Sequence, residues 1–182
     1  HWWGWLVGKI KWALNGFEHK AISFANYKPP RNHKTFEYRL GRFKEETDII
    51  RLRWLDSICK NTGAKIVMTT TMRNDFTIEE WNKLFNYCLK LEHIKVIGIT
   101  GYDKEDRIRG YEVQSWLDEH KDEVEDFIVL DDDHDFLESQ FNNFFPTDPY
   151  CGLTPEICRR IERHFNEQGK YYRMLWKIKE LN

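Results

Sequence analysis

Three short apolar runs, each preceded by a segment with helical spacing, constrain the fold of this chain more than any other feature. The runs cover residues 64–68, 94–100 and 126–130. Short and mostly apolar strands are typical of a parallel sheet that is buried on both faces. The alternation of such strands with helices predicts an α/β fold, a three-layer sandwich in which helices cover both faces of a mainly parallel sheet.

The helices between these runs carry their own start and stop signals. Apolar residues recur at helical spacing from Asp48 onward, with Asp48 as the expected N-cap and Gly63 as the expected stop. Thr77 and Glu80 form a capping box for the next helix. A further helix is predicted over residues 109–119, ahead of the third strand.

The length of the chain suits one domain, and we expect residues 1–182 to form it. Two parts fall outside the alternating pattern. Residues 17–44 contain two consecutive prolines with scattered basic and aromatic side chains, which predicts a small cap-like insertion over the ligand site; a solvated loop is the alternative. Residues 154–181 are predicted to form C-terminal helices, the first opened by a Thr-Pro pair.

Composition narrows the setting in which the chain works. Its formal charge is −2 and its pI is near 6.4, so no broad basic surface for nucleic acid is expected. The four cysteines include no Cys-x-x-Cys pair, which favours a reducing, cytoplasmic location over a disulfide framework or a zinc site. The apolar run at the N-terminus is too short to cross a bilayer, so no membrane partner is predicted.

Polar residues follow each of the three predicted strands. They are Thr69–Arg73 after the first, Thr100–Tyr102 after the second and Asp131–Asp135 after the third. In open parallel sheets, ligands bind beyond the carboxyl ends of the strands. The sequence therefore predicts that hydroxyls, an arginine and several carboxylates surround one ligand.

The carboxylates after the third strand predict a metal site. Mg²⁺ prefers oxygen ligands and keeps several waters, so one or two carboxylates together with a substrate phosphate can hold it. Asp131 and Asp132 are the candidate ligands and candidate catalytic residues. A plain acidic turn is the alternative.

The residues after the first strand predict a phosphate site. Hydroxyls at a strand end, followed by free backbone N–H groups, can hold phosphoryl oxygens, and we assign this role to Thr69 and Thr70. Arg73 adds a fork-shaped donor that suits phosphate, and Arg109 can offset the charge of a phosphate or an Asp cluster. The alternatives are an ordinary β-branched strand end and two surface arginines.

Four segments in this order resemble the haloacid-dehalogenase-like (HAD) domain of the multi-domain "Swiss army knife" RNA-repair proteins, a family with single-domain relatives in bacteria and phages. The segments read GAKIVMTTTMR, RGYEVQSWL, FIVLDDDHDF and TDPYCGLT. The resemblance implies a Rossmann-like, HAD-type core and Mg²⁺-dependent phosphoryl transfer through an aspartyl-phosphate. It also implies that Thr69 binds phosphate, that Asp131 and Asp132 hold Mg²⁺, and that Arg109 stands in for the usual cationic residue.

The N-terminal motif departs from this family, which opens with a strand ending in D-x-D-G-V-L-N. The best counterpart here is KIKWALN, so Lys9 and Lys11 stand at the two catalytic Asp positions. A Lys ammonium group can neither form an acyl-phosphate nor coordinate Mg²⁺. Three explanations are open: an error in the N-terminal sequence, a relative that binds phosphate without hydrolysing it, or lysines that pair with Asp131 and Asp132 in place of the metal.

The resemblance implies a phosphohydrolase that acts on a phosphate monoester, either a nucleotide or a nucleic-acid end, with Mg²⁺ as cofactor. The alternative is a catalytically inactive HAD-like module that binds a phosphorylated ligand or a protein partner. An aromatic N-terminus could supply the surface for such a partner. Its tryptophans are Trp2, Trp3, Trp5 and Trp12.

Overall fold

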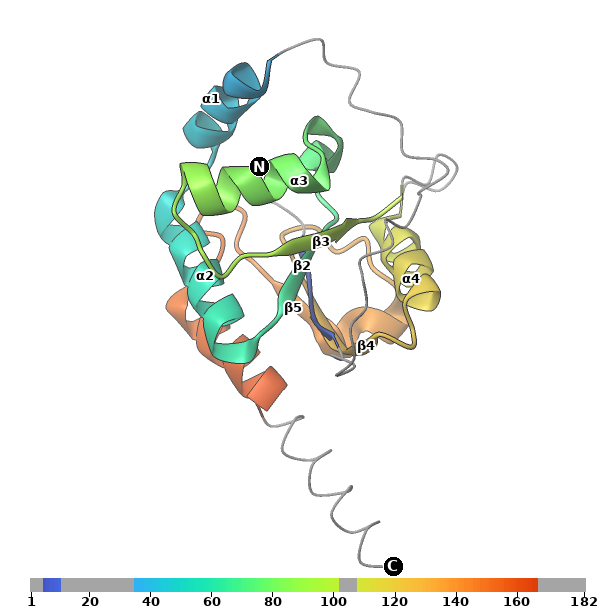
Figure 1. Ribbon diagram of the computed structural model, residues 1–182. Helices are drawn as coiled ribbons and strands as arrows, with labels where there is room; N and C mark the ends of the chain where they lie inside the picture. Colours follow the sequence, from blue (N-terminus) through green and yellow to red (C-terminus); the bar gives the residue numbers. More distant parts are fainter. Residues whose placement is uncertain (1–4, 11–34, 102–107, 167–182) are drawn as a thin grey trace, which may run out of the picture.

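The computed structural model describes residues 5–10, 35–101 and 108–166, which form a five-stranded sheet with helices on both faces (Figure 1). The strand order across the sheet is β3-β2-β1-β4-β5. The strands are β1 (Trp5–Ile10), β2 (Lys65–Met68), β3 (Val96–Ile99), β4 (Val124–Asp131) and β5 (Phe144–Pro146).

Four of the five strands run in one direction. β2 pairs with β3 and β4 pairs with β5 in parallel, whereas the central β1 is antiparallel to both β2 and β4. The prediction of a mainly parallel sheet is therefore confirmed, with a reversed central strand as the difference. Trp5 is aligned with Met68 on one side and with Leu130 on the other, so the ends of β2 and β4 lie level at one edge of the sheet.

The helices divide into two layers around this sheet. The first layer contains α2 (Ile49–Thr62), α3 (Ile78–Asn82), the π-helical turn η2 (Lys83–Cys88) and a helix of residues 155–166. These pack on the larger apolar core, whereas α4 (Arg109–Glu119) covers the opposite face through a smaller core. The α/β three-layer sandwich predicted from the alternating pattern is confirmed.

The local signals in the sequence act as expected. The Asp48 carboxylate accepts a hydrogen bond from the Ile50 N–H at 2.8 Å and begins α2. Gly63 ends α2 with a φ of 72°, a left-handed conformation that glycine adopts without steric cost. Thr77 and Glu80 form the predicted capping box at the start of α3.

Helix α1 (Phe36–Glu46) includes the last part of the predicted cap-like insertion. Phe43 on this helix is fully buried and lies edge-to-face against Trp81 and Phe85, with ring centroids 5.7 and 6.0 Å apart. This part of the segment therefore packs against the domain core. The cap itself remains a prediction, because residues 17–34 lie outside the described part of the chain.

Several other predictions also concern residues outside this part: Lys11, Trp2, Trp3, Trp12 and the last predicted helix, residues 171–181. Two short 3₁₀ helices complete the described elements, η1 (Thr71–Asp75) and η3 (Glu138–Asn143). None of the helices described is long and apolar enough to cross a bilayer.

Candidate functional site

The ends of β3 and β2, on one side of β1, and of β4 and β5, on the other, bring polar residues to one edge of the sheet. Thr69 follows β2 and Asp131 ends β4, one position beyond the aligned pair Met68 and Leu130. The two backbones are separated by two interstrand spacings, about 10 Å. The residues that follow the two outer strands lie at the same edge. After β3, the Thr100 N–H donates to the Met68 carbonyl at 3.0 Å, and after β5, the Thr147 N–H donates to the Asp131 carbonyl at 2.8 Å.

The two threonines after β2 differ in how their hydroxyls are used. Thr69 is completely buried, and its Oγ1 has no hydrogen-bond partner among the described residues. A buried hydroxyl without a partner is uncommon in proteins and marks a place where a ligand or water can bind. Thr70 is also buried, but its Oγ1 accepts from the Met72 N–H at 3.4 Å and caps η1.

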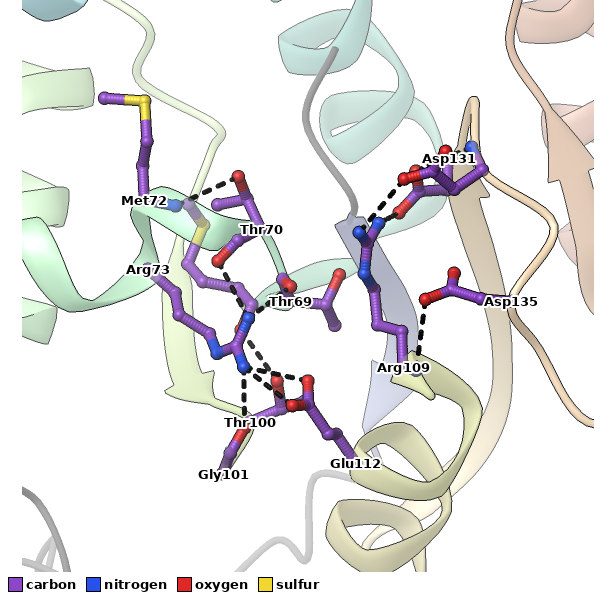
Figure 2. A network of polar contacts seen from close by, with 12 residues as sticks. Thr69, Thr70, Met72, Arg73, Thr100, Gly101, Arg109, Glu112, Asp131 and Asp135 are labelled. Carbon is purple, nitrogen blue, oxygen red and sulfur yellow. Dashed lines mark hydrogen bonds and ion pairs between the residues drawn. The ribbon is translucent and has the colours of Figure 1, made fainter. Parts of the chain in front are cut away.

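Arg73 is held by the protein itself. Its guanidinium donates to the carbonyls of Thr69, Thr70 and Gly101, and both oxygens of Glu112 lie 2.9 Å from its Nη2 (Figure 2). The side chains of Arg73 and Glu112 are 4% and 6% exposed. We therefore revise the phosphate-binding role predicted for Arg73: the side chain joins the ends of β2 and β3 to α4.

Asp131 and Arg109 form an ion pair on the other half of the edge (Figure 2). The Asp131 side chain is fully buried and that of Arg109 is 14% exposed, and Arg109 also lies 3.3 Å from Asp133. Burial raises the pKa of Asp131 to about 6, although Arg109 and the Asp133 N–H both act to lower it. Asp131 therefore changes its charge close to neutral pH.

The start of α4 is fixed against the loop that follows β4. The Asp135 carboxylate accepts from the Arg109 N–H at 3.2 Å, and the Asp135 carbonyl accepts from the Gly110 N–H at 2.9 Å. Gly110 allows this contact, since a Cβ at that position would lie 2.5 Å from the Leu137 nitrogen. This close approach places Arg109 beside Asp131.

Lys9 does not lie at this edge. Because β1 runs against its neighbours, Lys9 is aligned with Asp126, five positions before Asp131 on β4. Five strand residues span about 17 Å, so the hypothesis that Lys9 pairs with Asp131 or Asp132 is corrected. Arg109 supplies the cation next to Asp131 instead.

Comparison with known proteins identifies the family. Residues 25–158 match the family described as the HAD domain in Swiss Army Knife RNA repair proteins. This segment is most of the chain and contains every residue of the edge described above. The chain belongs to this family. The resemblance inferred from the sequence is confirmed, and the HAD domain falls within a hydrolase superfamily of the phosphatase type.

The matched segment of this HAD domain begins after β1, so Lys9 lies outside it. No curated protein and no solved structure gives a significant match to the chain.

The family generally uses Mg²⁺, and the acidic loop after β4 can be tested for it. One Asp131 oxygen pairs with Arg109, and the other accepts from the Asp133 N–H at 3.1 Å. Asp132 is half-buried, and no group of three or more His, Cys, Asp or Glu side chains suited to a metal occurs within the described ranges. Both Asp131 oxygens are therefore already engaged by the protein, and the Mg²⁺ role of Asp131 and Asp132 stays a prediction.

Two residues of the edge were not found from the sequence: Glu112 and Thr147. Glu112 is buried in the first turn of α4, next to Val113 of the smaller core. An acid so close to the inward face of a helix is a signal that it pairs with a buried cation. Thr147 offers no such signal, because its place depends on the short strand β5.

Proposed function

We propose that this HAD domain is a phosphohydrolase of phosphate monoesters, with nucleotides or nucleic-acid ends as substrates. In this proposal the phosphoryl group binds at the carboxyl edge of the sheet, between Thr69 and Arg109. The observation that carries the proposal is the register, in which one residue of β1 is level with the ends of both β2 and β4.

Each half of the edge contributes a different interaction. The Thr69 hydroxyl is a buried donor without a partner among the described residues, and a phosphoryl oxygen would accept from it. Arg109 offers a guanidinium whose geometry suits a phosphate and whose side chain is partly exposed. Together they would hold one phosphoryl group from two sides.

Asp131 supports a role in proton transfer. A buried carboxyl group with a pKa of about 6 can both give up and accept a proton near neutral pH. Its contact with Arg109 fixes the carboxyl at the edge. Asp132 is more exposed, and its catalytic role stays a prediction.

A second candidate function is binding of the same ligand without hydrolysis. It is favoured by the course of β1, which brings Lys9 to Asp126 and offers no acid beside Asp131 along residues 5–10. Transfer through an aspartyl-phosphate would then need an acid from outside the described residues.

Two assays on the same variants test the proposal. Hydrolysis of p-nitrophenyl phosphate measures turnover, and calorimetric titration with inorganic phosphate measures binding. Thr69→Val should weaken phosphate binding about tenfold, the order of one hydrogen bond to a charged group. Because the Thr69 hydroxyl has no described partner, the variant should keep or slightly gain folding stability.

Thr62→Val is the matched control for the loss of a hydroxyl. Thr62 lies at the opposite end of β2, and its hydroxyl donates to the Ile58 carbonyl within α2. It should leave phosphate affinity unchanged. Turnover that is lost in Asp131→Asn supports the hydrolase, whereas binding without turnover in the parent chain supports the second candidate. Phosphate affinity that is the same in Thr69→Val and the parent chain would contradict both.

A further inference from the structure

We infer that Tyr150 is a stacking platform for a nucleobase, so that the phosphorylated ligand of the edge site is a nucleotide or the end of a nucleic-acid strand. The inference rests on the proposed function, because it concerns what is attached to the bound phosphate. It assigns a residue that determines which phosphate monoester is preferred.

Tyr150 is the most exposed of the large apolar side chains in the described residues, with 91% of its surface accessible. A tyrosine in this state leaves nearly its whole ring in water, and an exposed ring on a fixed backbone is an efficient binding element. Few conformations are lost when a partner stacks on it.

The backbone beneath the ring is fixed by several hydrogen bonds. The Asp148 carboxylate accepts from the Tyr150 and Cys151 N–H groups, both at 2.7 Å, and these bonds lower the pKa of Asp148. The Gly152 N–H donates to the Asp148 carbonyl at 2.6 Å and closes the turn. Gly152 has a φ of 59°, which a residue with a side chain would adopt only with strain.

Helix α2 also contacts this turn. Arg51 donates from Nε to the Cys151 carbonyl at 2.9 Å, and its guanidinium lies over the Trp54 ring at 4.5 Å. Leu153, directly after the turn, is buried in the larger core. The turn of residues 148–152 is therefore anchored to two parts of the domain, while the Tyr150 ring is left outward.

This turn follows the strand that borders Asp131. Pro146 is aligned with Asp131, and the Thr147 N–H donates to the Asp131 carbonyl. Tyr150 is four residues beyond Pro146, so its Cα lies at most about 14 Å from the end of β5. The turn that carries Tyr150 therefore starts from the same edge of the sheet as Asp131.

Stacking is the interaction that such a ring offers. Every nucleobase has a π-face, and aromatic side chains bind bases on that face with little dependence on sequence. A positive or apolar partner could also stack on the ring, but Arg109, at the same carboxyl edge of the sheet, favours a ligand that carries a phosphate. A phosphorylated nucleoside or strand end combines both features in one molecule.

Calorimetric titration with four ligands tests the inference on the full chain: inorganic phosphate, ribose 5-phosphate, AMP and a tetra-adenylate with a terminal phosphate. If the chain hydrolyses a ligand, the comparison uses kcat/KM. The parent chain should bind AMP or the tetra-adenylate at least tenfold more tightly than ribose 5-phosphate. Tyr150→Ala should remove this preference and leave inorganic phosphate binding unchanged, whereas Tyr150→Phe should keep it.

Tyr87→Ala is the matched control, since Tyr87 is 77% exposed on η2, away from the β4 and β5 ends. It should change none of the four affinities. Loss of affinity for the tetra-adenylate alone identifies a strand end as the ligand, and loss for AMP as well identifies a base directly attached to the phosphorylated sugar. Both results support Tyr150 as the platform.

Three results would overturn the inference while the proposed function stands: AMP and the tetra-adenylate both binding no more tightly than ribose 5-phosphate, parental AMP and tetra-adenylate affinities in Tyr150→Ala, or a loss caused by Tyr111→Ala instead. Tyr111 is 46% exposed in the first turn of α4 and would place the base on the other face. Failure of the proposed function looks different, because inorganic phosphate would then bind weakly or be insensitive to Thr69→Val.

Discussion

The two halves of the carboxyl edge each contain an arginine, and the two arginines behave differently. Arg73, on the β2 side, donates to three carbonyls and to both oxygens of a buried Glu112. Arg109, on the β4 side, contacts Asp131 and the largely exposed Asp133, and keeps part of its own surface open. From the sequence, both were candidates for binding the ligand.

The comparison shows that position at a strand end is not enough to make an arginine a ligand-binding residue. The number of partners that the protein already supplies decides the matter, because a guanidinium that already donates to several buried oxygens must lose interactions before it can meet a phosphate. Arg73 stabilises the edge, whereas Arg109 has the capacity to exchange a carboxylate for a phosphoryl oxygen.

The largest effect is expected when the Arg73 pair is broken. Glu112→Ala leaves a guanidinium buried without its carboxylate, which typically costs about 3–5 kcal/mol. We expect this loss in the free energy of unfolding measured by urea denaturation. Glu46→Ala is the control, since it breaks the exposed Arg42–Glu46 pair and should cost less than about 0.5 kcal/mol. Equal losses of stability in the two variants would contradict the structural role assigned to the buried Arg73–Glu112 pair.

A smaller effect is expected from Gly110→Ala. The added Cβ would lie 2.5 Å from the Leu137 nitrogen and 2.9 Å from the Phe136 Cα, so the start of α4 must shift away from the loop after β4. We expect a stability loss of about 1–3 kcal/mol, the usual range for overpacking. Phosphate affinity should fall as well, because Arg109 moves with the helix.

Gly41→Ala is the control for this change. A Cβ at Gly41, in the middle of α1, meets nothing within 4 Å, so the variant should be as stable as the parent chain or slightly more so. Unchanged stability in Gly110→Ala would show that the contact between α4 and the loop is not as close as described.

Arg109→Gln tests the second arginine through phosphate affinity rather than through folding stability. Removal of the guanidinium should weaken phosphate binding about tenfold, as expected for a charged hydrogen-bond donor. At pH 5 the fold should tolerate the change, since Asp131 is then protonated and needs no cation. Calorimetry measures the affinity and thermal unfolding measures the stability. A variant with parental phosphate affinity would exclude Arg109 from the site.

The smallest effect is a dependence of anion binding on pH. Since the pKa of Asp131 is raised to about 6, its carboxylate takes up a proton below that value and releases Arg109. Sulfate, which stays doubly charged over this range, should therefore bind several-fold more tightly at pH 5.5 than at pH 7.5. Asp131→Asn should flatten this profile.

Protonation of Asp131 also makes the folding stability depend on pH, and the direction of this dependence follows from the raised pKa. A carboxyl group whose pKa is higher in the folded state favours folding most below its unfolded pKa, and the benefit is lost as pH rises through about 6. The stability of Asp131→Asn relative to the parent chain should therefore improve between pH 4.5 and pH 7.5. The opposite trend would mean that Arg109 dominates and that the pKa of Asp131 is lowered.

Much of the fold could be predicted because its signals are local. The Asp48 cap, the Gly63 stop and the capping box of Thr77 and Glu80 each depend on neighbouring residues, and each appears in the structure. The meeting of Thr69 and Asp131 at one edge also followed from the sequence, because the carboxyl ends of parallel strands share an edge.

The parts that escaped prediction depend on long-range contacts. Side chains alternate along a strand in the same way whichever direction it runs, so the pattern of β1 could not reveal that it is antiparallel. The contact between Arg73 and Glu112 joins residues 39 positions apart and depends on how α4 packs against β3. For that reason the sequence could not separate a structural arginine from an exchangeable one.

A crystal structure with bound inorganic phosphate or sulfate tests the central claim most directly. We predict one anion at the carboxyl edge that accepts a hydrogen bond from the Thr69 Oγ1 and contacts the Arg109 guanidinium, with Arg73 still paired to Glu112. An anion that contacts Arg73 while Arg109 stays on Asp131, or one bound away from this edge, would contradict the account.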